Sequence, residues 1–203
     1  MKILITGFEP FGGEEQNPSA LLLEKLPKKL KSALLSTALL PVSFQKVREE
    51  ILRLLEEEKP DVVICLGQAG GRDRITPERV AINLMDTESP DNDGFAPSEE
   101  PIDPLGPNAL FSNLPNKALV AAAKEQNLPV ALSNTAGTFV CNYLLYTLLR
   151  LAETQSPPLR CGFFHLPYLP EQTEDKKPGT PSLSLEEMET SLLQMLAILE
   201  NLL

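Results

Sequence analysis

The chain has 203 residues, 42% of them hydrophobic and 23% charged, which suits one folded domain, residues 1–203, and excludes a disordered chain. Its 28 acidic residues against 18 lysines and arginines give a net charge of −10, which disfavours binding to nucleic acid or to anionic membranes. Three cysteines make no disulfide framework, and no apolar run suits a transmembrane helix or a signal peptide, so we expect a cytoplasmic protein.

The elements predicted along the chain alternate between strand and helix. A short strand at 2–6 leads into a loop rich in glycine and phenylalanine, and Asn17-Pro18 then indicates the start of a helix that runs to about Leu26. Apolar spacing predicts further strands at 61–66, 79–85, 129–133 and 160–165, and further helices at 44–58, 116–127, 137–153 and 185–202. Residues 33–41 fit either a strand or a helix, and their place in the order favours a strand. This alternation predicts a three-layer α/β domain with a largely parallel sheet.

The remaining segments are polar or rich in proline. The lysine-rich stretch 28–31 indicates a solvated turn. Segment 87–115 is too long for a simple connection and is either a functional loop or an arm holding a short hairpin. Residues 170–182 are expected to be mobile, and Ser184 with Glu187 resembles a capping box for the last helix.

The carboxyl ends of the predicted strands locate the expected site. Ligands of such sheets bind beyond these ends, so the loops after Thr6, Leu66, Ser133 and His165 should converge. The converging segments include one cysteine, Cys141, and the only histidine of the chain, His165.

Cys141 and His165 are the candidates for nucleophilic chemistry. Cys141 lies in the first turn of a predicted helix, where free amide groups and the helix dipole should lower the pKa of its thiol. A cysteine at a helix start and a histidine at a strand end suit a Cys–His nucleophilic site. The alternatives are a small buried hydrophobe for Cys141 and a structural role for His165. Cys65 and Cys161 lie within predicted strands and are expected in the core.

Metal and nucleotide sites fit the sequence less well. Along one strand Cys161 and His165 would be ~13 Å apart, whereas each zinc ligand must lie within about 2.3 Å of the ion. We therefore expect no metal. The glycine-rich loop 67–72 lacks the lysine and hydroxyl residue of a phosphate-binding loop. It suits a backbone that approaches a ligand closely, with Gln68 available for hydrogen bonds.

Three further residues are candidates around this pair. Glu78 follows the glycine-rich loop and could orient the histidine as the third member of a triad, or could be a surface glutamate paired with Arg79. Phe8 and Phe11 lie at the first loop and either form the wall of a pocket or cover the core.

Five sequence blocks resemble the pyroglutamyl peptidase type I family. They are GFEPFGG with Asn17-Pro18, LGQAGGR at 66–72, ITPERVAIN at 75–83, SNTAGTFVCN at 133–142 and FFHLPYLPEQ at 163–172, in the family's order. The resemblance implies a cysteine peptidase that removes an N-terminal pyroglutamyl (5-oxoproline) residue from peptides. It also implies an α/β/α sandwich with a mixed, largely parallel sheet, no cofactor, and a homodimer or homotetramer.

The resemblance also assigns site residues. It places the nucleophile at Cys141, the histidine at His165 and the glutamate at Glu78, and it places the substrate pocket at Phe8, Phe11, Gln68, Phe139 and Val140. Segments 98–107 and 173–183 follow no family pattern. Two other functions stay open: a binding protein for pyroglutamyl peptides that does not hydrolyse them, and an enzyme acting on nucleosides or phosphates, suggested by the glycine-rich loop with Arg72, Arg74 and Arg79.

Overall fold

The central sheet of the computed structural model, which describes residues 1–156 and 158–203, has six strands in the order β2-β3-β1-β4-β8-β5. The four inner strands are mutually parallel and the short edge strands β2 and β5 are antiparallel, so the predicted mixed, largely parallel sheet is confirmed. The strands are β1 (Lys2–Phe8), β2 (Lys29–Leu30), β3 (Ala33–Leu40), β4 (Val62–Gln68), β5 (Thr76–Pro77) and β8 (Arg160–Leu166).

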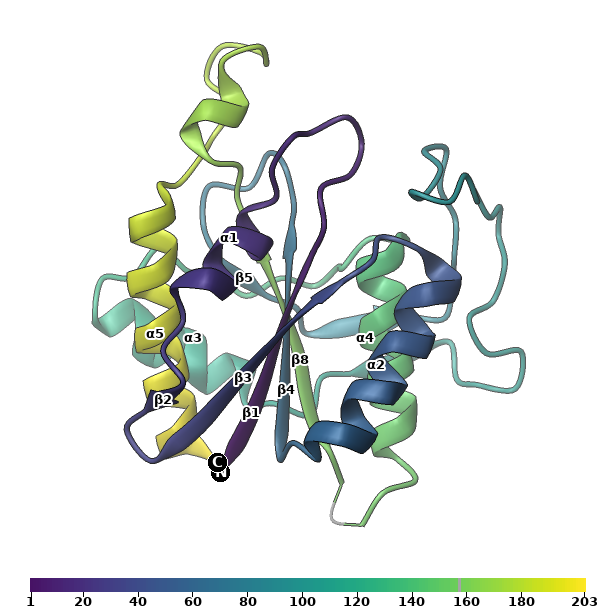
Figure 1. Ribbon diagram of the computed structural model, residues 1–203, viewed down its shortest axis with the longest axis horizontal. Helices are drawn as coiled ribbons and strands as arrows, with labels where there is room; N and C mark the ends of the chain where they lie inside the picture. Colours follow the sequence, from purple (N-terminus) through teal and green to yellow (C-terminus); the bar gives the residue numbers. More distant parts are fainter. Residues whose placement is uncertain (157) are drawn as a thin grey trace.

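Helices cover both faces of this sheet, which confirms the three-layer α/β/α sandwich (Figure 1). One face is packed against α1 (Pro18–Lys25), α3 (Asn116–Glu125) and α5 (Leu185–Leu202). The other is packed against α2 (Phe44–Glu58) and α4 (Val140–Ala152). β4 is buried along its whole length because helices lie on both sides of it. No helix among the described residues is long and apolar enough to cross a membrane.

Local sequence signals explain where several helices begin. The Asn17 side chain accepts a hydrogen bond from the amide of Ser19, and proline occupies the first position of α1. At α5 the Ser184 hydroxyl accepts from the amide of Glu187, whose carboxylate accepts from the amide of Ser184. The predicted capping box is therefore confirmed.

Several predicted elements differ from the structure. Residues 28–31 include the edge strand β2 rather than only a turn. Residues 129–133 form single bridges, Ile75 with Val130 and Glu78 with Ser133, instead of a strand. In both cases the pairing with neighbouring strands decides whether the segment forms a strand, and the local sequence does not show this pairing.

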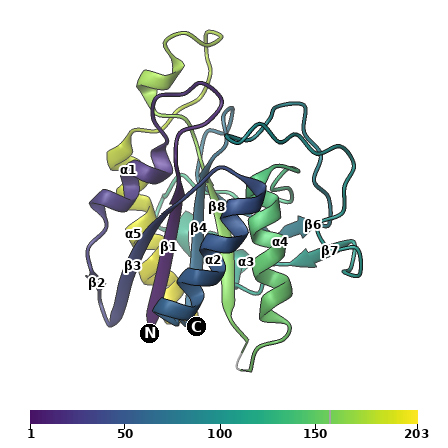
Figure 2. The same cartoon turned by 45° about the vertical axis from the view of Figure 1, so that its right-hand side comes forward.

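The long segment after residue 86 is an arm beside the main sheet. It contributes β7 (Ala109–Phe111), which pairs antiparallel with β6 (Val80–Ile82) in a separate two-stranded sheet (Figure 2). The arm also crosses the start of α2, where Asp91 accepts a hydrogen bond from the amide of Phe44. Residues 170–182, expected to be mobile, include the 3₁₀ helix η1 (Pro170–Thr173).

Candidate active site

A cavity of about 350 Å³ opens beyond the carboxyl ends of the inner strands, where the sequence places the site. Segments after β1, after β4, before α4 and after β8 meet there, as predicted. The lining residues are Phe11, Gly12, Glu14, Gln68, Gly70, Ala136, Phe139, Cys141, His165 and Tyr168. Cys141 and His165, 24 positions apart in the chain, therefore face one space.

His165 and Glu78 are held together by the sheet. β5 runs antiparallel to β8, and the amide of Glu78 donates a 2.8 Å hydrogen bond to the carbonyl of Phe163. This places Oε1 of Glu78 2.7 Å from Nδ1 of His165, with both side chains buried. An ionised carboxylate only accepts hydrogen bonds, so Nδ1 carries the hydrogen and Nε2 is the basic nitrogen.

Arg72, rather than Arg79, is the charge partner of Glu78. Its Nη1 lies 2.7 Å from Oε1 of Glu78, and its Nη2 donates a 3.0 Å hydrogen bond to the carbonyl of Thr135. Arg72 thus connects the glycine-rich loop, the buried carboxylate and the segment before α4. From the sequence alone Arg72 suggests only phosphate binding, although the block LGQAGGR that contains it is a signal for its presence at this site.

Cys141 is the second residue of α4. The first backbone hydrogen bond of this helix runs from the amide of Tyr143 to the carbonyl of Phe139, so the amides of residues 140–142 precede the helical hydrogen-bond series. Asn142 fixes this turn: its side chain accepts from the amide of Ile82 and donates to the carbonyls of Ile82 and Leu84. The helix start that carries the thiol is therefore tied to β6.

The Cys141 thiol lies against the backbone of the glycine-rich loop. A Cβ added at Gly67 would come within 3.1 Å of the Cys141 sulfur and 2.7 Å of the Phe163 ring. Only glycine fits at this position without moving the nucleophile. This supports the close-approach interpretation of the loop and places Cys141 beside the strand pair β4–β8, which carries His165.

The electrostatics of Cys141 differ from the prediction. Burial raises the pKa of the Cys141 thiol to about 12, and the negative charge of Glu78 adds to this rise. The expected lowering at the helix start is therefore outweighed by loss of water. Burial lowers the pKa of His165 below its ordinary value of 6.5, against the opposing effect of Glu78. Both shifts act in the same sense: each favours the uncharged form, the thiol of Cys141 and the neutral imidazole of His165.

The apolar wall of the cavity is aromatic. The rings of Phe11 and Phe139 are 6.1 Å apart, and Phe44 packs edge-on against Phe139 at 5.5 Å. Phe8 and Val140 are buried in the core instead of lining the cavity, and Phe8 packs against Phe163 at 6.3 Å. Any effect of Phe8 and Val140 on a ligand would act through the residues in front of them.

The other two cysteines lie in the core, as expected. Cys65 and Cys161 are fully buried and free. Burial raises the pKa of both thiols, that of Cys65 to about 12. Neither lines the cavity that holds Cys141.

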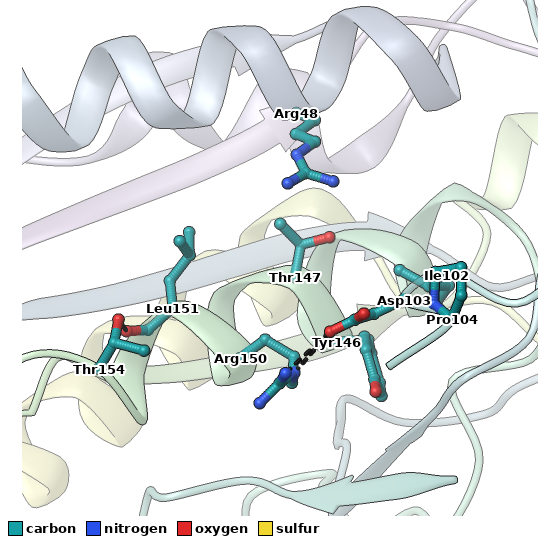
Figure 3. Close-up of a pocket in the computed structure, with 9 residues that line it drawn as sticks. All are labelled: Arg48, Ile102, Asp103, Pro104, Tyr146, Thr147, Arg150, Leu151 and Thr154. Carbon is teal, nitrogen blue, oxygen red and sulfur yellow. Dashed lines mark hydrogen bonds and ion pairs between the residues drawn. The ribbon is translucent and has the colours of Figure 1, made fainter. Parts of the chain in front are cut away.

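A second hollow, of about 320 Å³, lies between α2 and α4 (Figure 3). Arg48 points into it from α2, and Arg150 on α4 pairs with Asp103 of the arm at 2.9 Å. Cys141, His165 and Glu78 are not among its lining residues. Its chemistry is separate from that of the cavity above the strand ends.

Comparison with known proteins gives one consistent result. Residues 1–200 match the family model described as pyroglutamyl peptidase. The pyrrolidone-carboxylate peptidases of Thermococcus onnurineus and Thermosipho africanus are 52% and 49% identical to the chain, over 92% and 95% of it and 92% and 94% of their own lengths.

Solved structures similar to the chain come from the same family of peptidases. The pyroglutamyl peptidase I of Bacillus amyloliquefaciens is 43% identical, with a TM-score of 0.92 over 98% of this chain and 93% of its own. A mutant pyrrolidone carboxyl peptidase of the hyperthermophile Pyrococcus furiosus is 41% identical, with a TM-score of 0.94 over the whole of both chains.

Proposed function

The chain belongs to the pyroglutamyl peptidase family, and we propose that it removes an N-terminal pyroglutamyl residue from peptides with Cys141 as nucleophile, His165 as acid–base group and Glu78 as its orienting carboxylate. The observation that carries this proposal is the single cavity lined by Cys141 and His165, with Glu78 2.7 Å behind the imidazole. A nucleophile, a base and an orienting group in this order are the parts that covalent catalysis needs.

The walls of the cavity suit a pyroglutamyl ring. Its lactam is neutral and compact, with one N–H and one carbonyl, so its pocket should be apolar with a few polar groups. Phe11 and Phe139 supply the apolar surface, and Gln68 supplies an amide. Peptidases that take a free N-terminus instead need a carboxylate or a metal to hold the ammonium group.

In the proposed mechanism the proton transfers start from an uncharged thiol and an uncharged imidazole. Nε2 of His165 takes the thiol proton as the Cys141 sulfur attacks the pyroglutamyl carbonyl, and Glu78 stabilises the imidazolium that forms. The amides at the start of α4 are the donors for the developing oxyanion. His165 then protonates the leaving amine, and it activates the water that hydrolyses the acyl-enzyme.

Further properties follow from the same proposal. The whole chain, residues 1–203, acts as one catalytic domain, on peptides and without a cofactor. We place it in the cytoplasm, where its three free thiols stay reduced, and as a homodimer or homotetramer. Light scattering at several concentrations measures the last point, and a monomer throughout would contradict it.

The test is release of a fluorescent amine from its L-pyroglutamyl amide, with the L-prolyl amide as the matched control. We expect reductant-dependent cleavage of the pyroglutamyl amide alone, and a loss of at least about 10³-fold in Cys141→Ser with circular dichroism unchanged. Cleavage by folded Cys141→Ser near the wild-type rate would exclude Cys141 as nucleophile.

The two other functions predict different results. A binding protein would be stabilised by pyroglutamate without cleaving the amide. An enzyme acting on nucleosides or phosphates would show phosphate-dependent activity or be stabilised by nucleosides. It would use the arginines near the glycine-rich loop, but Arg72 pairs with Glu78 and Arg74 pairs with Asp73. These ion pairs favour the peptidase.

A further inference from the structure

The side-chain amide of Gln172 joins three segments at the rim of the cavity. Gln172 lies in η1, beyond β8, and its Oε1 accepts a 3.0 Å hydrogen bond from the amide of Leu169. Its Nε2 lies 3.2 Å from the carbonyl of Gln16, 3.1 Å from Oε2 of Glu14 and 2.8 Å from Oε1 of Gln68. In Figure 1 both the segment around η1 and the loop after β1 project beyond the same ends of the strands.

The partners of Gln172 permit one orientation of its amide. The backbone N–H of Leu169 only donates, so it requires an oxygen opposite it. The carbonyl of Gln16 and the carboxylate of Glu14 only accept, so they require the NH₂ group. Turning the amide over would set a donor against a donor and acceptors against acceptors, and such mismatches in a partly buried site are costly.

The orientation of the Gln172 amide also fixes the orientation of the Gln68 amide. Because Nε2 of Gln172 donates to Oε1 of Gln68, the oxygen of Gln68 is turned toward η1. The NH₂ group of Gln68 donates no hydrogen bond to any other residue that the structure describes, and Gln68, 7% exposed, lines the cavity with Cys141 and His165. The site therefore offers an N–H donor.

A neighbouring ion pair holds the network in place. Nζ of Lys176 lies 2.7 Å from Oε1 of Glu14 and 4.5 Å above the ring of Tyr168, another residue that lines the cavity. Lys176 thus compensates the charge of Glu14, whose other oxygen faces Gln172. Gln172 and Lys176 therefore connect the segment after β8 to the loop after β1 by hydrogen bonds and an ion pair.

We propose that Gln172 is a positioning residue for specificity: it fixes the amide of Gln68 so that its NH₂ group faces the ring carbonyl of the bound pyroglutamyl residue. The inference rests on the proposed function, because that carbonyl is the group that a prolyl residue lacks. The resulting hydrogen bond selects a lactam over a saturated ring. Gln172 does this without touching the substrate.

The test compares Gln172→Glu and Gln172→Met with the wild type. In Gln172→Glu the new carboxylate accepts, so the NH₂ group of Gln68 turns toward it and the oxygen of Gln68 faces the lactam carbonyl. The new carboxylate also faces Glu14 and the carbonyl of Gln16, so the melting temperature of this variant should fall as well. In Gln172→Met the amide of Gln68 is released and takes both orientations. The matched control is Glu171→Gln, at the exposed neighbouring position on η1.

The readouts are kcat and KM for the pyroglutamyl amide, inhibition by 2-pyrrolidone as a free lactam, and the melting temperature. We expect kcat/KM to fall about 100-fold in Gln172→Glu and about 10-fold in Gln172→Met, mainly through KM. The inhibition constant of 2-pyrrolidone should rise by similar factors, and the control should match the wild type.

Two results would overturn the role of Gln172. One is an unchanged inhibition constant for 2-pyrrolidone in Gln172→Glu. The other is a fall in kcat with KM unchanged, which would locate the effect in the chemical step rather than in recognition of the lactam. A wild type that neither cleaves the pyroglutamyl amide nor binds 2-pyrrolidone would instead contradict the proposed function, and the inference with it.

Discussion

A buried carboxylate needs compensating partners, and at the residue scale Glu78 has two. Its Oε1 faces both the guanidinium of Arg72 and the imidazole of His165, each at 2.7 Å, and the side chain is fully buried. Its Oε2 accepts no hydrogen bond from the described residues. One oxygen therefore carries both contacts, and a change at this position disturbs the ion pair and the orientation of the imidazole together.

We expect Glu78→Gln to lower kcat by about 10³–10⁴-fold with little change in KM, because the amide no longer enforces the tautomer that leaves Nε2 basic. The melting temperature should also fall, since Arg72 loses its counter-charge. Steady-state kinetics with the pyroglutamyl amide measures the first effect. A kcat within tenfold of the wild type would show that Glu78 does not orient His165.

The sequence indicates the triad positions better than it indicates their electrostatics. Cys141 and His165 could be singled out because residue type and predicted strand ends are local features. The raised pKa of Cys141 could not be predicted from the sequence, because it depends on burial by segments distant in the chain and on the charge of Glu78. The roles of Arg72 and Gln172 could not be predicted for the same reason: their hydrogen-bond partners lie in other loops.

At the scale of elements, strong periodic signals gave correct predictions and weak ones did not. The five α-helices among the described residues and the inner strands β1, β4 and β8 follow from apolar spacing and caps such as Asn17 and Ser184, whereas β3 follows from its place in the order. The edge strand β2 has only two residues, and the segment 129–133 pairs by single bridges. Such short elements are decided by their neighbours in space, so their own sequence is a poor guide.

The capping box of α5 allows a stability prediction. Ser184→Ala removes the side-chain acceptor for the amide of Glu187, and we expect the free energy of unfolding to fall by about 1 kcal/mol. Urea unfolding measures this change, with Thr190→Ala, at an exposed position inside the same helix, as the control. The kinetic constants should stay unchanged, because α5 packs on the face of the sheet opposite α4. Equal urea midpoints for Ser184→Ala and Thr190→Ala would show that the cap does not contribute to stability.

At the scale of the whole molecule, we expect stability and activity between about pH 5 and 7.5 to follow one titrating group. His165 is the only histidine of the chain, so it is the only side chain whose ordinary pKa lies between about 5 and 7.5. It faces Glu78, Arg72 and the Cys141 thiol, and burial lowers its pKa below 6.5 in the folded state. In the unfolded chain its pKa returns to about 6.5.

The sign of the pH effect follows from these two values. Between the folded pKa and 6.5 the unfolded chain binds more protons, so the free energy of unfolding decreases as the pH falls through this window, by at most about 1.4 kcal/mol per pH unit. Urea unfolding from pH 7.5 to 5 should show this slope, and His165→Asn should flatten it. The acid limb of kcat/KM should lie below pH 6.5, because the free enzyme needs a neutral imidazole. An acid limb above pH 6.5, or a slope that persists in His165→Asn, would mean that another group controls both properties.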